Sequence, residues 1–248
     1  GMYKKFPEIK FKTFTPSKTK AVELARQVSG EQVDSIAQLV DCEYIMLGMK
    51  PQQIPSFIEE NVELLKGKKI ISILTAITIE KLMQAFETEN VCRIMPNTPS
   101  AVGAGILLTS FSEKFEFPKE IENAFSACGI VEVVSQKDLD LLTVYAGSGP
   151  AYVFQFALYL QELMQDAGID NSVARRIANQ LFLGSSKLMS ESDDSLSEMV
   201  NKVTSKGGVT IEAVKVFKEE EFAESFSRAL EAASKRNVEL AGELNSLK

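Results

Sequence analysis

Short apolar runs alternate with helical patterns over the first 137 residues of the chain. The runs are rich in Ile, Val, Leu and Met and are bounded by turn residues, which predicts buried strands. The expected strands are residues 9–14, 43–49, 69–74, 92–95, 105–111 and 130–134. Apolar positions spaced three and four apart predict helices at 19–28, 35–40, 54–65, 79–86 and 118–127. This alternation is typical of an α/β fold with a parallel sheet covered by helices.

No strand pattern follows residue 137, and the rest of the chain is expected to be helical. The expected helices are 138–145, 150–167, 171–189, 195–203 and 221–247, with a further helical pattern beginning after residue 208. Asn171 and Ser195 are the expected N-caps of two of them. The helix over 150–167 is apolar nearly all round, so it must be buried on most sides, and we expect it in a dimer core. The chain thus predicts an α/β domain at 1–137 and an all-α domain at 138–248.

Composition and charge exclude several classes of function. The formal net charge of −7 argues against nucleic acid and against an anionic membrane surface as the main partner. No apolar run is long enough to span a membrane, and the start has no signal-peptide pattern, so we predict a cytoplasmic protein. The absence of histidine excludes a Ser/His/Asp triad and a Cys/His dyad, and we predict no metal site. The odd number of widely spaced cysteines favours reduced thiols.

The stretch VTSKGGVTI, residues 203–211, contains the clearest candidate binding loop. Gly207 and Gly208 let consecutive backbone N–H groups turn toward one point, and the helix that follows adds the positive end of its dipole. The hydroxyls of Ser205 and Thr210 add further hydrogen-bonding groups. The loop could therefore hold a small carboxylate or phosphate. The alternative is an ordinary Gly-Gly turn in which Thr210 caps the next helix.

Three long motifs in order carry a family resemblance. They are RIMPNTPSAVGAG at 93–105, TVYAGSGPAYVF at 143–154, and VTSKGGVTI. Together with MKPQ at 49–52 they resemble the pyrroline-5-carboxylate reductase family over nearly the whole chain. The resemblance implies an N-terminal Rossmann-like NAD(P)-binding domain and a helical domain that interlocks with its copy in a homodimer or higher homo-oligomer. It also implies reduction of 1-pyrroline-5-carboxylate to proline, the last step of proline biosynthesis, by hydride transfer from NAD(P)H.

The same resemblance assigns roles in the second domain. Thr210 matches the residue whose hydroxyl hydrogen-bonds the ring nitrogen of the substrate, and it is the expected catalytic residue. The remaining substrate-binding positions are Val203, Ser205, Gly207 and Gly208, whose backbone groups would hold the substrate carboxylate.

Cofactor-binding residues are expected at the ends of the predicted strands. They are Ser17, Lys18, Lys50, Pro51, Thr75, Ala76 and Asn97. Asn97 would lie near the nicotinamide, or else belong to a plain Asn-Thr-Pro turn. The Cβ atom of Ala76 stands where the family usually has glycine, so it would crowd the cofactor. No acidic residue follows the first strand in sequence to bind a ribose 2′-hydroxyl, whereas Lys18 does follow it, so NADPH is expected to be preferred over NADH.

One motif of the family is missing from the 248 residues, the G-x-G-x-x-G turn that holds a dinucleotide pyrophosphate. The chain resembles the family from its second strand onward, so a strand, turn and helix of roughly 30 residues is expected to be absent. Either the gene start is assigned too late or the protein is a shortened relative. The alternative function is therefore a non-catalytic homologue that dimerises without binding cofactor productively. A related imine or hydroxyacid reductase with another substrate is the third possibility.

Overall fold

A computed structural model describes residues 5–245, apart from the side chains of Pro51 and of residues 244 and 245. The chain divides into two compact units. The first, called here the α/β unit, contains the residues up to Gly149 and those from Ala233 onward. The second, called the helical unit, is Pro150–Ala232. The domain limit at residue 137 was predicted from the loss of strand patterns along the sequence, not from contacts between residues. It stays a prediction.

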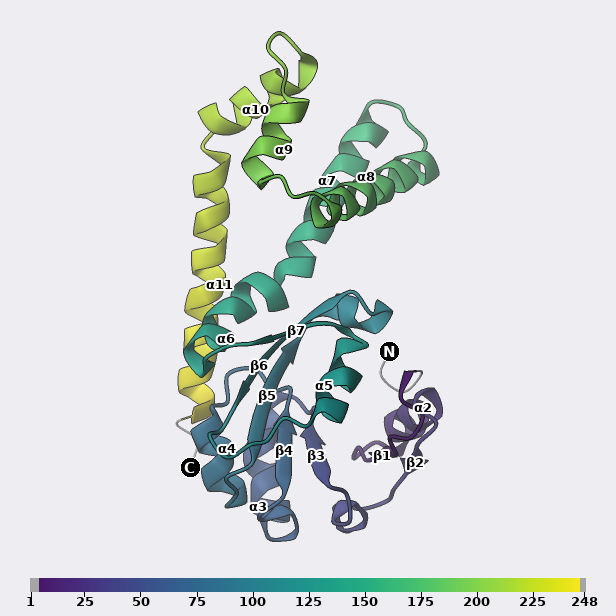
Figure 1. Ribbon diagram of the computed structural model, residues 1–248, viewed down its shortest axis with the longest axis vertical. Coiled ribbons are helices and arrows are strands. Elements are labelled where there is room, and N and C mark those ends of the chain that lie inside the picture. The colour runs from purple at the N-terminus through teal and green to yellow at the C-terminus, as the bar shows by residue number, and fades with distance from the viewer. Residues whose placement is uncertain (1–4, 246–248) are drawn as a thin grey trace. The chain divides into compact units, whose positions relative to one another are not determined.

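The α/β unit is built on a five-stranded sheet in the order β3-β4-β5-β6-β7 (Figure 1). The strands are β3 Tyr44–Leu47, β4 Lys69–Ser72, β5 Val91–Pro96, β6 Gly105–Phe111 and β7 Gly129–Val133. β3, β4 and β5 are parallel, and so are β6 and β7. β6 runs antiparallel to β5, so the prediction of a wholly parallel sheet is wrong at this strand. The reason is the short connection of residues 97–104, because a parallel neighbour needs a crossover of a dozen residues or more.

A second, two-stranded sheet precedes the first. β1 Lys12–Thr13 pairs in parallel with β2 Glu31–Gln32, and α2 Lys18–Gln27 connects them. Within the described residues neither strand pairs with the larger sheet, so β1 and β3 are both edge strands. The predicted strand 9–14 is thus mostly wrong, because only two of its residues find a partner. β2 carries no apolar run, and the sequence pattern did not predict it.

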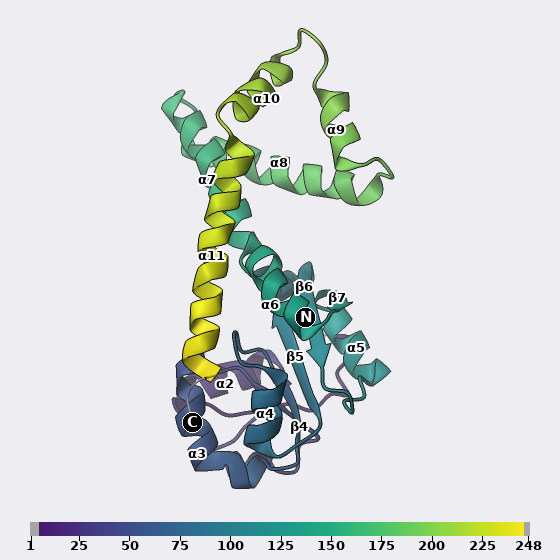
Figure 2. The ribbon, with the colours of Figure 1, turned by 90° about the vertical axis from the view of Figure 1, so that its left-hand side faces the viewer.

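Helices cover both faces of the larger sheet (Figures 1 and 2). α3 Ile54–Leu65 and α4 Ile79–Phe86 lie on one face, with the bounds that the sequence predicted. Their apolar side chains form one core cluster with strand residues that include Leu47, Ile70 and Val91. On the opposite face, α5 Lys119–Ser126 contributes Phe125 to a second cluster with Cys92. The predicted 35–40 helix is the short 3-10 helix η1 Ile36–Leu39, and the 3-10 helices η2 Pro51–Gln53 and η3 Thr98–Val102 follow β3 and β5.

A continuous helical stretch leads out of the α/β unit. α6 Gln136–Leu142 places Leu139 in a third cluster with Met95 and Leu108. It continues into a π-helical turn, η4 Thr143–Gly147. Such turns are rare and are often found at functional sites. The sequence predicted a helix here but not its π character.

The helical unit confirms the all-α prediction, since none of its residues is in a strand. Its helices are α7 Gly149–Asp166, α8 Asn171–Glu191, α9 Leu196–Val203, α10 Val209–Glu219 and the first half of α11 Phe222–Asn245. Ser195 caps α9 in a capping box with Glu198, as predicted. Asp170, not Asn171, caps α8, because its carboxylate accepts from the N–H groups of Ser172 and Val173.

Apolar side chains of α7 remain exposed in the single chain. Phe156 packs on Phe222 and Phe226 of α11, but Phe154 is 62% exposed and Leu163 65% exposed. No residue of α7 is buried. Such a surface on a long helix marks an interface with another chain, as the sequence predicted for the dimer core.

Candidate functional site

Four of the predicted cofactor residues follow neighbouring parallel strands at the same edge of the sheet. Lys50 follows β3, Thr75 and Ala76 form a turn after β4, and Asn97 follows β5. Because β3, β4 and β5 are parallel neighbours, their carboxyl ends meet at the edge where open α/β sheets bind ligands. Pro51 begins η2 at the same edge, and its side chain lies outside the described part of the structure.

Ala76 has a left-handed backbone with φ of 68°. This conformation costs an L-residue roughly 1–2 kcal/mol relative to its ordinary regions, and glycine adopts it freely. The residue is 6% exposed and packs within the core cluster under α3 and α4. The backbone at this turn therefore has the geometry of a glycine position with a Cβ atom added.

Asn97 uses both polar atoms of its side chain within the protein. Its Nδ2 donates to the carbonyl oxygen of Ala146 in the π-helical turn at 3.0 Å. Its Oδ1 accepts from the N–H of Ile106 at 2.9 Å. Asn97 is also the N-cap residue of η3, without a side-chain capping bond. The side chain thus fastens the end of β5 to β6 and to the turn that follows α6.

Ser17 and Lys18 lie at the start of α2, where Ser17 is the N-cap residue without a side-chain capping bond. The Nζ of Lys18 lies 2.7 Å from Oδ1 of Asp34. Lys18, and after it Gln32, hold the pKa of the Asp34 carboxyl below its usual value. The sequence has no acidic residue directly after the first strand, and Asp34 comes close to Lys18 only through the fold. The parallel pairing of β1 with β2 brings the segments after both strands to one edge.

The predicted substrate loop forms a tight turn at the start of α10. The N–H of Gly208 donates to the carbonyl oxygen of Ser205 at 2.9 Å, and Gly207 has φ of 77°, which suits the third position of a type II turn. Gly208 is the N-cap residue of α10 and provides no side-chain acceptor, so the first backbone N–H groups of the helix lack a side-chain partner. Thr210 lies in the first turn rather than at the cap, so the capping alternative is wrong.

The remaining substrate residues lie in the same short segment. Val203 ends α9 and is 65% exposed, and both Ser205 and Thr210 are exposed. A Cβ atom on Gly208 would lie 2.8 Å from Oγ of Ser205, so glycine is required for the hydroxyl to stay at this position. Two hydroxyl residues and the N-terminal end of α10 thus lie within one exposed segment, and such an end favours a carboxylate.

Arg93 is a functional candidate that sequence reasoning passed over. It lies in β5, is 1% exposed, and donates from Nη2 to Oδ1 of Asp140 at 2.8 Å. Its Nε and Nη1 have no hydrogen-bond partner in the described part of the chain. A charged residue within the apolar run at 92–95 was the available signal, because buried charges are rare without a specific partner.

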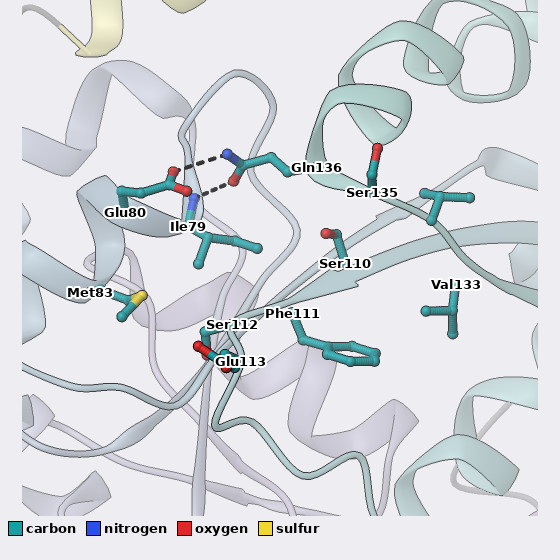
Figure 3. Close-up of a pocket in the computed structure, with 11 residues that line it drawn as sticks. Ile79, Glu80, Met83, Ser110, Phe111, Ser112, Glu113, Val133, Ser135 and Gln136 are labelled. Atoms are coloured by element: carbon teal, nitrogen blue, oxygen red, sulfur yellow. Dashed lines mark hydrogen bonds between the residues drawn. The ribbon is translucent and has the colours of Figure 1, made fainter.

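A pocket of about 450 Å³ lies between α4, the end of β6 and the β7–α6 connection (Figure 3). Nε2 of Gln136 donates to Glu80 at 2.9 Å, and its Oε1 accepts from the N–H of Ile79. The hydrogen bond from Gln136 is the main reason why the pKa of Glu80 is lowered. Glu113 adds a second carboxylate, and the lining residues include no Lys or Arg. None of the predicted site residues lines this pocket, and its charge is unsuited to an anionic substrate.

Among residues 5–245, no group of three or more His, Cys, Asp or Glu side chains is placed to hold a metal ion. Within the same range, no helix combines the length and the apolar character that crossing a bilayer requires.

Comparisons with known proteins agree with one another. Residues 136–240 match the family model for pyrroline-5-carboxylate reductase dimerisation. A pyrroline-5-carboxylate reductase of Synechocystis sp. is 33% identical over 204 residues, which cover 80% of this chain and 75% of that protein. One of Staphylococcus aureus is 32% identical over 213 residues, covering 84% of this chain and 78% of the relative.

Solved structures show the same similarity. A pyrroline-5-carboxylate reductase from Coxiella burnetii has a TM-score of 0.82 at 28% identity, covering 94% of this chain and 88% of that one. The enzyme from Plasmodium falciparum, solved with NADP bound, has a TM-score of 0.81 at 25% identity, covering 94% of this chain and 87% of that one.

Proposed function

The chain belongs to the pyrroline-5-carboxylate reductase family of oxidoreductases, and on this premise we propose that it reduces 1-pyrroline-5-carboxylate to proline with NADPH as the hydride donor. The observation that carries the proposal is the loop at 203–210. There a turn with Gly207 in the left-handed region leads into α10, whose first N–H groups have no side-chain cap and whose first turn carries Thr210.

The substrate is an anionic cyclic imine, and this loop fits both of its polar parts. The substrate carboxylate would accept from Ser205 and from the first N–H groups of α10, where the helix dipole favours negative charge. The hydroxyl of Thr210 would donate to the ring nitrogen. That hydrogen bond stabilises the electron density that the nitrogen gains during reduction.

The edge formed by β3, β4 and β5 fits the nicotinamide half of a dinucleotide. Lys50, Thr75 and Ala76 follow these strands, and Ala76 has the left-handed backbone of a glycine position while its side chain packs in the core cluster. A bound NADPH supplies the hydride, while these residues set its orientation and exclude water. Ser17 and Lys18 would contact the adenosine end, with Lys18 toward a 2′-phosphate. We place the reaction in the cytoplasm. We also propose that the protein acts as a homodimer, and the match to the dimerisation model supports this part.

The direct test is NADPH oxidation by the purified chain on addition of pyrroline-5-carboxylate, with NADH measured in parallel. We expect a protein-dependent rate that is higher with NADPH. The proposal is contradicted if NADPH binds, as shown by its fluorescence, but no imine reduction follows over the accessible range of substrate concentration.

One observation favours a second candidate, the non-catalytic homologue. In the described residues β1 and β2 form a two-stranded sheet that does not pair with the larger sheet, so the strands of the expected Rossmann-like domain are divided between two sheets. This candidate predicts a stable dimer without NADPH binding. Sedimentation of the chain together with a fluorescence titration of NADPH separates the two functions.

A further inference from the structure

Arg93 is the largest fully buried side chain of the described residues, and its surroundings are polar. Ser72 of β4 and Ser110 of β6 are its register partners on the neighbouring strands, so the three side chains form a row on one face of the sheet. Ser72 is 1% exposed and Ser110 5% exposed. A polar row in the middle of a sheet face costs burial energy that apolar residues would not cost.

The residue that accepts a hydrogen bond from Arg93 is Asp140, which lies on α6. This helix continues directly into the π-helical turn. Asp140 accepts from Arg93 at 2.8 Å, and six positions later the carbonyl oxygen of Ala146 accepts from Asn97. Arg93 and Asn97 belong to the same strand and its end, while Asp140 and Ala146 belong to one helical stretch. The strand and the helical stretch are therefore braced at two points, one of them at the cofactor edge.

A third contact joins α11 to this brace. Nδ2 of Asn237 donates to the carbonyl oxygen of Asp140 at 3.0 Å. The chain leaves the α/β unit after Gly149 and returns to it at Ala233. Within the α/β unit, the segment through which the chain leaves and the segment through which it returns are therefore both linked to Asp140.

We propose that Arg93 is a positioning residue, which acts through Asp140 to hold the π-helical turn against the end of β5 and so fixes Asn97 at the nicotinamide edge. The catalytic part of this inference rests on the proposed function. Arg93 itself contacts neither substrate nor cofactor. Its ion pair restricts the helical stretch to one conformation, in which the side chain of Asn97 donates to the carbonyl oxygen of Ala146.

Two features distinguish positioning from simple stabilisation. Only Arg93 of this pair is buried, since the Asp140 side chain is 40% exposed, and an ion pair that takes a charge out of water is often no more stabilising than apolar residues of similar volume. Moreover, Nε and Nη1 of Arg93 have no hydrogen-bond partner among residues 5–245, and this is a poor arrangement for stability. Replacing both charged residues together therefore removes the brace while keeping the fold.

The test is the double variant Arg93→Met/Asp140→Leu, compared with Lys114→Met/Glu89→Leu as a matched control. The control removes an exposed ion pair of the same unit, with an N–O distance of 2.6 Å. Hydrogen exchange of the amides at 143–149 is the readout, because it needs neither cofactor nor turnover. We expect about ten-fold faster exchange there in the first variant only, with β4 unchanged and Tm near that of the parent.

Unchanged exchange at 143–149 in a folded double variant would overturn the inference. If that variant does not fold, Asp140→Ala gives the answer, because this side chain is 40% exposed and alanine removes the oxygen that accepts from Arg93. The same acceleration is expected there, and its absence equally contradicts the proposal.

Turnover provides the second readout. In an active chain we expect the double variant to lose about ten-fold in kcat with little change in NADPH affinity, because the brace orients Asn97 rather than binding the dinucleotide. An unchanged kcat together with accelerated exchange contradicts the catalytic part. If the parent chain shows no turnover, the proposed function fails, whereas the exchange measurement still decides whether Arg93 positions the turn.

Discussion

Lys18 and Asp34 form an ion pair with an N–O distance of 2.7 Å, which joins the segments after β1 and β2. Both side chains are mostly exposed, at 72% and 64%. The lysine expected to attract a 2′-phosphate is thus already paired with a carboxylate. Any phosphate that reaches Lys18 has to compete with Asp34 and is repelled by it.

Asp34→Asn is therefore expected to raise the affinity for NADPH and leave that for NADH nearly unchanged. Removing an exposed negative charge beside a phosphate is expected to lower Kd by up to roughly five-fold at low salt. Fluorescence titration at two salt concentrations measures it, with Glu43→Gln as the control, since Glu43 pairs with Lys69 elsewhere. An equal gain for NADH would show that Asp34 does not discriminate between the two cofactors.

Ala76→Gly is expected to keep or slightly raise stability and to strengthen NADPH binding. The left-handed strain of about 1–2 kcal/mol disappears, while glycine adds roughly 0.5–1 kcal/mol of unfolded-state entropy. Loss of the Cβ atom also opens the turn after β4. Glu221→Gly is the control, because Glu221 has φ of 49° in the helical unit. Weaker NADPH binding by the Ala76 variant would contradict the predicted crowding.

Thr210→Val is expected to lower kcat by about ten- to a hundred-fold, the cost of losing one hydrogen bond to a group that gains charge. NADPH affinity should remain nearly unchanged, because valine preserves the shape of the side chain. Steady-state kinetics and a fluorescence titration provide the two quantities. Thr204→Val is the matched control, since its hydroxyl already donates to the carbonyl oxygen of Val200. A turnover number equal to that of the parent would exclude the assigned role of Thr210.

Lys206→Pro is expected to stabilise the turn before α10. Lys206 is the second residue of the turn closed by Ser205 and Gly208, a position where proline is favoured. The gain should be about 0.5–1 kcal/mol through a less flexible unfolded chain. Thermal unfolding measures it, and Lys206→Ala separates loss of charge from gain of rigidity. A lower Tm for the proline variant alone would show that the backbone here departs from the proline geometry.

Burial raises the pKa of the Cys92 thiol from its ordinary value of 9.0 to about 12. The folded protein keeps this proton after the unfolded chain has lost it, so its contribution to stability is complete below pH 9 and declines as the pH rises toward 12. From pH 8 to pH 10 we expect a loss of about 1.4 kcal/mol that Cys92→Ala does not show. Denaturant titrations of both proteins measure the difference. Parallel curves for the two would mean that Cys92 ionises in the folded state.

The sequence predicted those elements whose pattern lies within one segment. α3 and α4 have the predicted bounds, and the all-helical second domain was evident from the loss of strand patterns after residue 137. The turn before α10 was equally visible, because two consecutive glycines favour a turn, whereas its role in binding the substrate stays a prediction. In each case the periodicity or the turn residues are themselves the physical cause of the structure.

The tertiary structure alone decided which distant residues meet. Asp140 is 47 positions from Arg93, and Asn97 is 49 from Ala146. Neither pair has a local signature, because each depends on how α6 packs against β5. The Lys18–Asp34 pair likewise required the pairing of β1 with β2, a strand without any apolar pattern. By itself the sequence determined the elements and the loop chemistry. The contacts that hold and tune the site follow from packing, since burial and hydrogen bonding between distant segments form only when the chain folds.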